Sequence, residues 1–303
     1  MTNVGPFHQG ELDVQKLTGE QEIASRLSEL IQDSIPTKAL DFIRQQSIIW
    51  IGTEGKDGFL WAFPLFGSPG FINPSKENLL EINSEDDFCI PGEWRSTLQR
   101  GKSIGCLAID LATRRRLRIN GFIREIRKNK LQIDIHESYP NCPKYIRKRE
   151  LQGNPYFCEF AIDSSGKELN EQTKNIIDRS DTAFVVSSAV NRTDLSHRGG
   201  ESGFIKHKLN NKILVPDYNG NSMFNTLGNF KINPQGGMVI VDFTQGYYLQ
   251  ISGKIDIIFD NEPSILDTGG TNRFWELDIH KWYLFHLKNN FEWIDLDFSP
   301  YNP

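Results

Sequence analysis

Residues 105–126 read GCLAIDLATRRRLRINGFIREI, and residues 237–258 read GMVIVDFTQGYYLQISGKIDII. In each stretch two apolar runs flank a polar turn, which is typical of a β-hairpin. The first run ends on an acidic residue in both, Asp110 and Asp242, and a glycine lies at the same place in both second runs. A match of this kind at an offset of 132 residues indicates an internal repeat. We therefore expect a duplicated β domain.

The repeat extends toward the N-terminal side of both stretches. Gly70-Phe71 in the first half and Gly203-Phe204 in the second each precede a further hairpin pattern. Short apolar runs, separated by Gly, Pro and Asn, amount to about six strands per half. Closure into a small barrel would remove exposed strand edges, although the pattern alone leaves a sandwich open. The fold class is predicted to be mainly β with flanking helices (α+β).

Helical patterns lie at three places. Apolar residues at helical spacing predict two short helices between residues 20 and 45. Helical segments are also expected at CPKYIRKREL (142–151) and KELNEQTKNII (167–177), which would connect two β domains. We predict one domain at 1–150, with the N-terminal helices and the first barrel, and a second at 151–303, with the connector and the second barrel.

Composition indicates a soluble globular protein. The 303 residues are 38% hydrophobic, and the net charge is −5 with a pI of about 5.8. No apolar run approaches the ~18 residues of a membrane span, and no secretory signal begins the sequence. The four cysteines, at 89, 106, 142 and 158, and the six histidines show no zinc spacing, so we assign no metal. We expect a cytoplasmic protein with reduced thiols.

Two polar, glycine-rich segments in the second half could bind a ligand. Residues 194–200 read DLSHRGG, and residues 217–222 read DYNGNS and lead into a predicted helix, MFNTLGNFKIN. Asn and Ser at the start of that helix could cap it, and its free N–H groups favour an anion. An ordinary Asn-Gly turn is the alternative. Arg198, beside two glycines, favours a phosphate site because a guanidinium binds phosphate with two hydrogen bonds.

His197 is the one candidate for proton transfer, although a lone loop histidine is more often structural. Residues 95–130 hold eleven Lys or Arg against Asp110 and Glu125, with the densest run at Arg114–Arg116 and Arg118. A solvated hairpin is one interpretation. The other is that arginines of the first half reach a phosphate bound by the second.

Several segments together resemble the two-barrel, FMN-binding branch of the pyridoxamine 5′-phosphate oxidase-related proteins. They are HQGELDVQ (8–15), GSPGF (67–71), IDLATRRRLRING (109–121), NCPKYI (141–146), LSHRGGESGFI (195–205) and PDYNGNSMFNTLGNFKINP (216–234). The resemblance implies two tandem split β-barrels with FMN at their junction. It also implies that the strand 204–208 and the turn 218–222 hold the ribityl phosphate, and that Lys208 contacts the flavin.

The sequence departs from the family where the oxidases have a Ser, Arg, Lys run, because Ser222, Met223 and Phe224 stand there. Phosphate contacts must therefore partly come from elsewhere. The residues predicted to bind the cofactor are Ser196, Arg198, Gly199, Lys208, Tyr218, Asn219, Gly220, Asn221, Ser222, Asn225, Arg116 and Arg118.

The predicted function is that of an FMN-dependent oxidoreductase of unidentified substrate. A non-enzymatic flavin or haem binding module is the alternative, and a nucleic-acid surface on the basic hairpin is a weaker one. The expected partners are a small-molecule substrate or electron donor, with no membrane and no nucleic acid, and a homodimer stays open. One flavin per chain is expected, because Trp94 and Arg95 stand where the second half has its Asn-Gly turn and helix.

Overall fold

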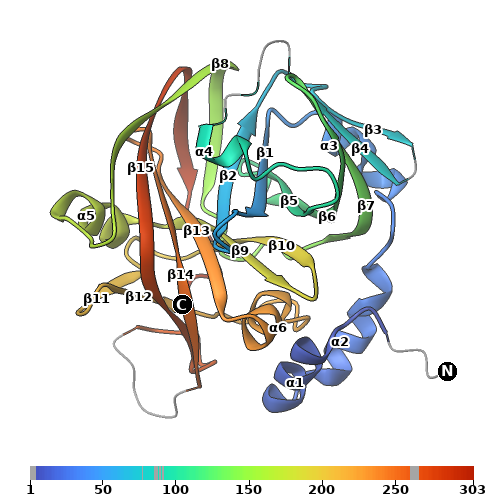
Figure 1. The fold of residues 1–303 in the computed structure, drawn as a ribbon. Coiled ribbons are helices and arrows are strands. Elements are labelled where there is room, and N and C mark those ends of the chain that lie inside the picture. Colours follow the sequence, from blue (N-terminus) through green and yellow to red (C-terminus); the bar gives the residue numbers. More distant parts are fainter. Residues whose placement is uncertain (1–4, 77, 85–87, 89, 91, 260–265) are drawn as a thin grey trace.

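In the computed structural model, two antiparallel sheets follow one another along the chain (Figure 1). The structure describes residues 5–76, 78–84, 88, 90, 92–259 and 266–303. The first sheet has the order β2-β1-β5-β6-β7-β4-β3. Its strands are β1 (Ile48–Glu54), β2 (Leu60–Phe66), β3 (Ile72–Lys76), β4 (Leu79–Asn83), β5 (Ser103–Asp110), β6 (Arg115–Ile126) and β7 (Lys130–Pro140).

The second sheet repeats this order as β10-β9-β13-β14-β15-β12-β11, with β8 paired to β15. Its strands are β8 (Lys148–Gly166), β9 (Thr182–Ala189), β10 (Arg192–Gly199), β11 (Lys206–Lys208), β12 (Lys212–Pro216), β13 (Gln235–Asp242), β14 (Tyr247–Phe259) and β15 (Arg273–Asp297). The two stretches at an offset of 132 residues fall on equivalent hairpins, β5–β6 and β13–β14. The expectation of a mainly β chain is confirmed.

Short helices flank the sheets. They are α1 (Gln9–Thr18), α2 (Gln21–Leu27), α3 (Leu40–Arg44), α4 (Gly92–Arg95), α5 (Glu171–Arg179) and α6 (Asn225–Ile232), with 3-10 turns at Ser28–Leu30 and Thr37–Ala39. The two helices predicted between residues 20 and 45 are α2 and α3, and the helix predicted at 167–177 is α5. The sequence reading did not predict α1. That helix has a capping box between His8 and Glu11 and ends at Gly19 in the left-handed conformation.

The helix predicted at residues 142–151 is wrong. Residues from Lys148 onward form β8, which pairs with β15 from Lys148–Asp297 to Gly166–Trp282. The apolar residues of this segment have helical spacing, but pairing with β15, more than a hundred residues away, makes the segment a strand. Long-range pairing decides strand formation in such cases. The predicted domain boundary at residue 150 consequently falls inside β8.

Close backbone contacts join the two halves, and these contacts come in matching pairs. A Cβ on Gly105 of β5 would lie 2.7 Å from the backbone of Asp194 in β10. Equivalently, a Cβ on Gly237 of β13 would lie 2.0 Å from the carbonyl oxygen of Leu60 in β2. Between these two contacts the rings of Trp50 and Phe184 stack at 3.6 Å. Glycine is therefore required at both positions for the halves to pack this closely.

The N-terminal helix lies against α6, at one end of the second sheet (Figure 1). A Cβ on Gly10 would lie 2.2 Å from the carbonyl oxygen of Gly228, so the two helices cross at backbone distance. In the described part of the chain no helix is long and apolar enough to span a membrane. Of the cysteines in that part, Cys106 is buried and Cys142 and Cys158 are half-buried, whereas Cys89 lies outside it.

Candidate functional site: an anion cavity between the halves

A small polar cavity of about 70 Å³ lies at the N-terminal end of α6. Its walls come from both halves of the chain and include two of the three arginines that the sequence predicted to bind the cofactor, Arg118 and Arg198. The lining residues are Arg118, Arg198, Asp217, Tyr218, Gly220, Asn221, Ser222, Phe224, Asn225, Thr226 and Leu227.

Arg118 is the contribution of the first half. Its side chain extends from β6, is only 5% exposed, and its Nη1 donates to the Tyr139 hydroxyl at 2.9 Å and to Asn225 Oδ1 at 3.2 Å. The same Nη1 lies 3.2 Å from the Asp194 carboxylate. Burial is the largest single influence and lowers the pKa of this guanidinium, but Asp194, Tyr139 and Glu137 together raise the pKa above its ordinary value. Arg118 is therefore a permanently charged group at the junction.

Arg198 approaches the same cavity from β10. Its contacts within the protein are long, at 3.4 Å to Ser196 Oγ and to the His197 carbonyl and 3.5 Å to Asp217. The Nε atoms of both Arg118 and Arg198 are buried and have no hydrogen-bond partner among the described residues. Buried donors of this kind call for a partner, because an unsatisfied polar group costs free energy. Both arginines that line the cavity therefore keep an unused hydrogen-bond donor.

The turn before α6 is held by charged groups behind it. Asp217 accepts a hydrogen bond from Arg273 Nε at 3.2 Å as well as facing Arg198. Ser222 and Phe224 both adopt positive φ, 59° in each case. The expected Ser cap is wrong: the N-cap is Phe224, which makes no side-chain cap bond, and Ser222 Oγ instead donates to Glu20. The N–H groups at the start of α6 are consequently left uncapped by a side chain.

The N-terminal segment secures this turn at several points. Glu20 accepts from Ser222 Oγ at 2.6 Å and from Arg273 Nη1 at 2.7 Å. Glu11 accepts from Asn225 Nδ2 at 2.6 Å. The cavity is therefore assembled from three separate regions of the chain.

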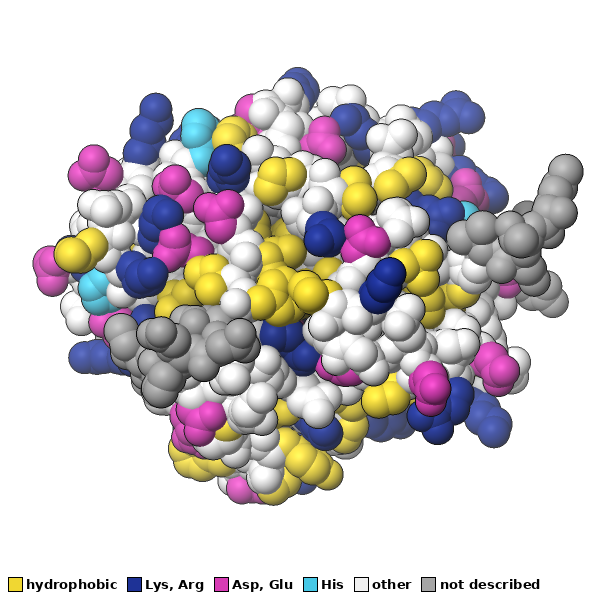
Figure 2. All heavy atoms as spheres, turned by 90° about the horizontal axis from the view of Figure 1, so that it is seen from below, with side chains coloured by type: hydrophobic (Ala, Val, Ile, Leu, Met, Phe, Trp, Pro, Cys, Tyr) yellow, Lys and Arg dark blue, Asp and Glu magenta, His cyan; other side chains and the backbone are white. Residues whose placement is uncertain are grey.

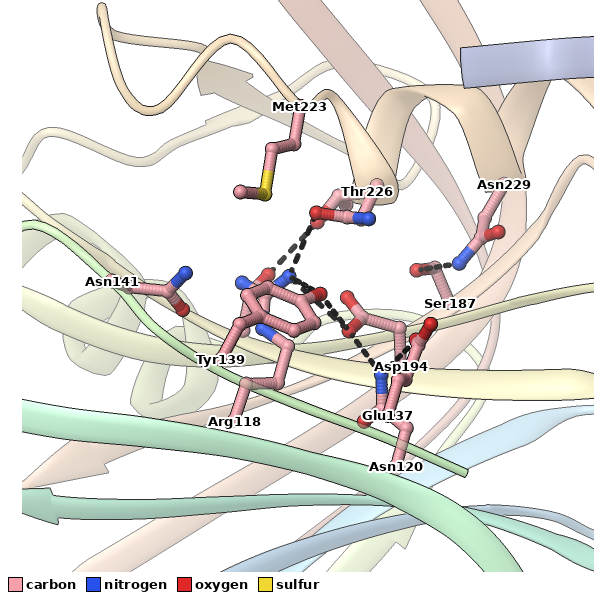
Figure 3. A network of polar contacts seen from close by, with 12 residues as sticks. Arg118, Asn120, Glu137, Tyr139, Asn141, Ser187, Asp194, Met223, Thr226 and Asn229 are labelled. Carbon is pink, nitrogen blue, oxygen red and sulfur yellow. Dashed lines mark hydrogen bonds and ion pairs between the residues drawn. The ribbon is translucent and has the colours of Figure 1, made fainter. Parts of the chain in front are cut away.

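Figure 3 shows the polar network behind Arg118. Asn120 donates through Nδ2 to both Glu137 and Asp194, at 2.9 Å each. Because Asp194 also faces Arg118, this carboxylate fixes the guanidinium from the side away from α6. Asn229 of α6 donates to Ser187 Oγ at 2.9 Å.

Some predicted residues lie close to the cavity without lining it. Ser196 Oγ pairs with the hydroxyl of Thr226 at 2.8 Å, and the Asn219 carbonyl accepts from the Tyr145 hydroxyl. The carbonyl oxygen of Tyr145 occupies the space where a side chain at position 199 would begin. A Cβ on Gly199 would lie 2.0 Å from that oxygen. Its lack of a side chain therefore serves the packing of the chain.

Arg116 lies in the same region, where its Nε donates to the carbonyl of Cys142 at 2.9 Å. Burial, reinforced by the charges of Arg118 and Arg198 and opposed by Cys142, lowers its pKa to about 10. Arg116 does not line the cavity itself.

Two predicted residues are not brought to the cavity. His197 is buried on the other face of β10 against Phe184, and its Nε2 has no partner among the described residues. Burial, with Arg116 and Arg198 nearby, holds its pKa well below the ordinary value. Lys208 lies on β11 and pairs with Glu276 at 2.6 Å. Their predicted roles in proton transfer and flavin contact stay predictions.

The equivalent position in the first half is filled by aromatic side chains. Trp94 of α4 is 1% exposed, and its ring meets Trp61 edge-on at 5.9 Å and Tyr283 at 4.8 Å. Gln250 stands where Arg118 would be expected from the offset, and it donates to the Ala62 carbonyl. A pocket beside Trp94, also lined by Trp61 and Tyr283, has no arginine among its described lining residues, so none takes the place of Arg198 there.

The arginines of the basic run in the first half contact other parts of the chain. Arg114 donates to the carbonyls of Ile146 and Phe298, and Arg115 lies over the ring of Phe42 at 4.7 Å. On the face of the molecule drawn in Figure 2, cationic and anionic side chains alternate among apolar ones. The interpretation of the run as a purely solvated hairpin therefore does not describe Arg114, Arg116 and Arg118.

The sequence reading missed four residues that shape the site: Glu11, Glu20, Asp194 and Arg273. Asp194 lies at the edge of a segment that was singled out for its composition, so a period-2 reading of β10 would have placed it on the face of Ser196 and Arg198. Glu11 and Glu20 contact the site across more than two hundred residues, and Arg273 contacts Asp217 across 56 residues. No local pattern signals such contacts.

No protein-family model matches the chain, and no curated protein matches it. Solved structures match parts of it. A provisionally assigned pyridoxamine 5′-phosphate oxidase from Lactobacillus delbrueckii has 13% identity and a TM-score of 0.28, covering 36% of this chain and 95% of its own. An FAD-binding protein from Mesorhizobium loti has 8% identity and a TM-score of 0.29, covering 44% and 99%. The heme storage protein HutZ from Vibrio cholerae has 12% identity and a TM-score of 0.25, covering 45% and 99%. At TM-scores this low, the matches assign neither a family nor a function to the chain.

Proposed function

We propose that this chain is a flavoprotein of two tandem split β-barrels that binds FMN, with the phosphate in the cavity at the start of α6, and that it acts as an oxidoreductase. The observation that carries the proposal is the convergence of Arg118 and Arg198, from different halves, on one uncapped helix N-terminus. Two guanidinium groups and free backbone N–H groups are the donors that proteins use for phosphate. The sequence resemblance described above points to the same ligand.

The size of the cavity suits the phosphate and not the flavin ring. A volume of about 70 Å³ is well below the ~300–1,000 Å³ of sites that hold whole ligands. The ring system would therefore lie outside the cavity, with only the phosphate end inserted. The unpartnered Nε atoms of both arginines fit this use, because phosphate oxygens would satisfy them.

FMN, when bound, would supply the redox chemistry. The residues of this chain would hold and orient it. Arg118 and Arg198 would neutralise the phosphate, while Asp194 and Asp217 keep the two guanidinium groups in place from behind. Ordered partners of this kind reduce the loss of side-chain entropy on binding.

A purified sample tests the proposal directly. We expect a flavin absorbance spectrum, FMN by mass spectrometry, and binding of added FMN to stripped protein. Bleaching by NADH or NADPH would support an oxidoreductase, whereas a flavin that resists reduction would leave a binding module. A haem spectrum, or a stripped protein that binds neither FMN nor inorganic phosphate, would contradict the proposal.

A further inference from the structure

Glu11 is a buried carboxyl next to the anion cavity. Glu11 as a whole residue is 4% exposed, and it lies where α1 crosses α6. Its Oε1 accepts from Asn225 Nδ2 at 2.6 Å, and Asn225 Oδ1 in turn accepts from Arg118 Nη1 at 3.2 Å. Asn225 lines the cavity. Glu11 is therefore two hydrogen bonds away from a guanidinium that would bind the phosphate.

The neighbouring histidine does not neutralise Glu11. His8 Nε2 lies 3.6 Å from Glu11 Oε2, but its hydrogen bonds specify a neutral ring. The N–H of Gly10 donates to His8 Nδ1, so that nitrogen carries no proton. Nε2 lies 2.8 Å from Asn229 Oδ1, which can only accept, so Nε2 carries the single ring proton.

Two carboxylates near Glu11 make a negative charge on Glu11 unfavourable. Glu137 from β7 and Asp194 from β10 both raise its pKa by repulsion. Arg118 from β6 is the cation of this cluster, and Asp194 already pairs with it. Tyr139, which stands between them, has a pKa raised by burial and stays neutral. Burial is the largest influence on Glu11 and, against the hydrogen bonds from the His8 N–H and Asn225, raises its pKa to about 8.

We propose that Glu11 holds a proton whenever the cavity holds a phosphate, so that FMN binding and proton uptake at Glu11 are coupled. The inference rests on the proposed function of the cavity. A phosphate dianion placed against Arg118 adds negative charge to a buried cluster that already contains Asp194 and Glu137. Ionised Glu11 and bound phosphate therefore exclude one another, whereas the neutral carboxyl keeps its hydrogen bond from Asn225 and tolerates the ligand.

The direction of the pH effect follows from linkage. Bound FMN makes Glu11 hold its proton more tightly than in the free protein. FMN binding therefore takes up a proton at any pH at which Glu11 is ionised in the free protein. Above about pH 8, FMN affinity should fall by up to tenfold per pH unit. Below pH 8 the carboxyl is already neutral and the affinity should be flat. A phosphate monoester, with a second pKa of about 6, stays dianionic over this range.

The test compares FMN dissociation constants from pH 7 to 9.5 in the wild type, Glu11→Gln and the control Asp13→Asn. Glutamine keeps the shape of the neutral carboxyl, so Glu11→Gln should bind FMN at pH 9.5 nearly as tightly as at pH 7. Asp13 lies on the same helix and bonds Gln9, so Asp13→Asn should retain the wild-type pH dependence. All other ionisable groups near the site are the same in these three proteins.

Calorimetry of the wild type alone gives a second measurement if Glu11→Gln fails to fold. FMN titrations at pH 8.5 in buffers of different ionisation enthalpy should report uptake of a substantial fraction of one proton. FMN binding without proton uptake, or equal pH dependence in the wild type and Glu11→Gln, would overturn the inference and leave the proposed function intact. Failure of FMN to bind at every pH would overturn both.

Discussion

Replacement of Arg198 by alanine tests whether this residue binds phosphate or has only a structural role. Within the protein this guanidinium makes contacts of 3.4–3.5 Å, at the long limit of hydrogen bonding. Its partner Asp217 keeps Arg273 Nε at 3.2 Å after the change. The free energy of unfolding should therefore change by about 1 kcal/mol or less. Arg118 is less suitable, because its removal would leave Asp194 and Tyr139 without their cation.

The effect of Arg198→Ala on FMN binding should be much larger. A charge-assisted hydrogen bond contributes ~1.5–3 kcal/mol, so FMN affinity should fall roughly ten- to a hundredfold. Riboflavin has no phosphate, and its affinity should change little. Fluorescence or calorimetric titration of stripped protein with both ligands measures the difference.

Arg115→Ala is the matched control, because it removes the same charge from a side chain that lies over Phe42, outside the cavity. Its FMN affinity should stay within about twofold of the wild type at physiological salt, where a distant charge is screened. Equal losses of FMN and riboflavin affinity in Arg198→Ala, or an Arg115→Ala loss of the same size, would refute a phosphate role for Arg198.

Four further predictions follow from the structure. Titration of FMN into stripped protein should saturate at one per chain, since the equivalent position in the first half is occupied by Trp94; saturation near two would contradict this. Trp94→Ala should lower the free energy of unfolding by ~3–5 kcal/mol, measured by urea denaturation, because it empties the centre of an aromatic cluster. Gly105→Val should destabilise the fold, because the valine side chain would meet the backbone of Asp194. An equivalent change at exposed Gly5, where an added Cβ meets no atom within 4 Å, should have little effect; equal melting temperatures of the two variants would argue against a close junction. Because the pKa of Glu11 is about 8 in the folded protein and 4.5 as its ordinary value, the folded state binds the extra proton between these pH values. Wild-type stability relative to Glu11→Gln should therefore fall with rising pH by roughly 1.4 kcal/mol per unit between about pH 5 and 8, and pH-independent stability differences in urea would contradict the buried carboxyl.

The repeated hairpins were predictable because their signals are local. A polar turn between two apolar runs specifies β5–β6 and β13–β14 without any knowledge of distant partners. β8 was not predictable in this way, because its pairing with β15 is decided by residues at the far end of the chain. The N-terminal helix α1 was missed for a different reason: its capping box uses His8 in place of the usual Ser, Thr, Asp or Asn.

The candidate site was partly predictable from loop composition. Arg198 and the turn at 217–222 were identified because glycine, asparagine and a cation occur together, and the structure places them around one cavity. His197 was grouped with Arg198 because the two are adjacent in sequence. Adjacent residues of a strand point to opposite faces, so only one of them can line the cavity. Whether Arg118 would reach the site depended on the packing of the halves, which the sequence does not display.

Arg118 in the first half and Gln250 in the second occupy equivalent positions but are different residues. This difference has a consequence for how the protein can change by mutation. In a symmetric dimer of identical chains, every substitution at such a junction appears twice, so both sites gain or lose a residue together. Here each half carries its own copy of the position, and a change in one leaves the other untouched. One junction can therefore be filled by packed aromatic side chains while the other keeps its charged residues. Two identical chains in a symmetric dimer cannot differ in this way.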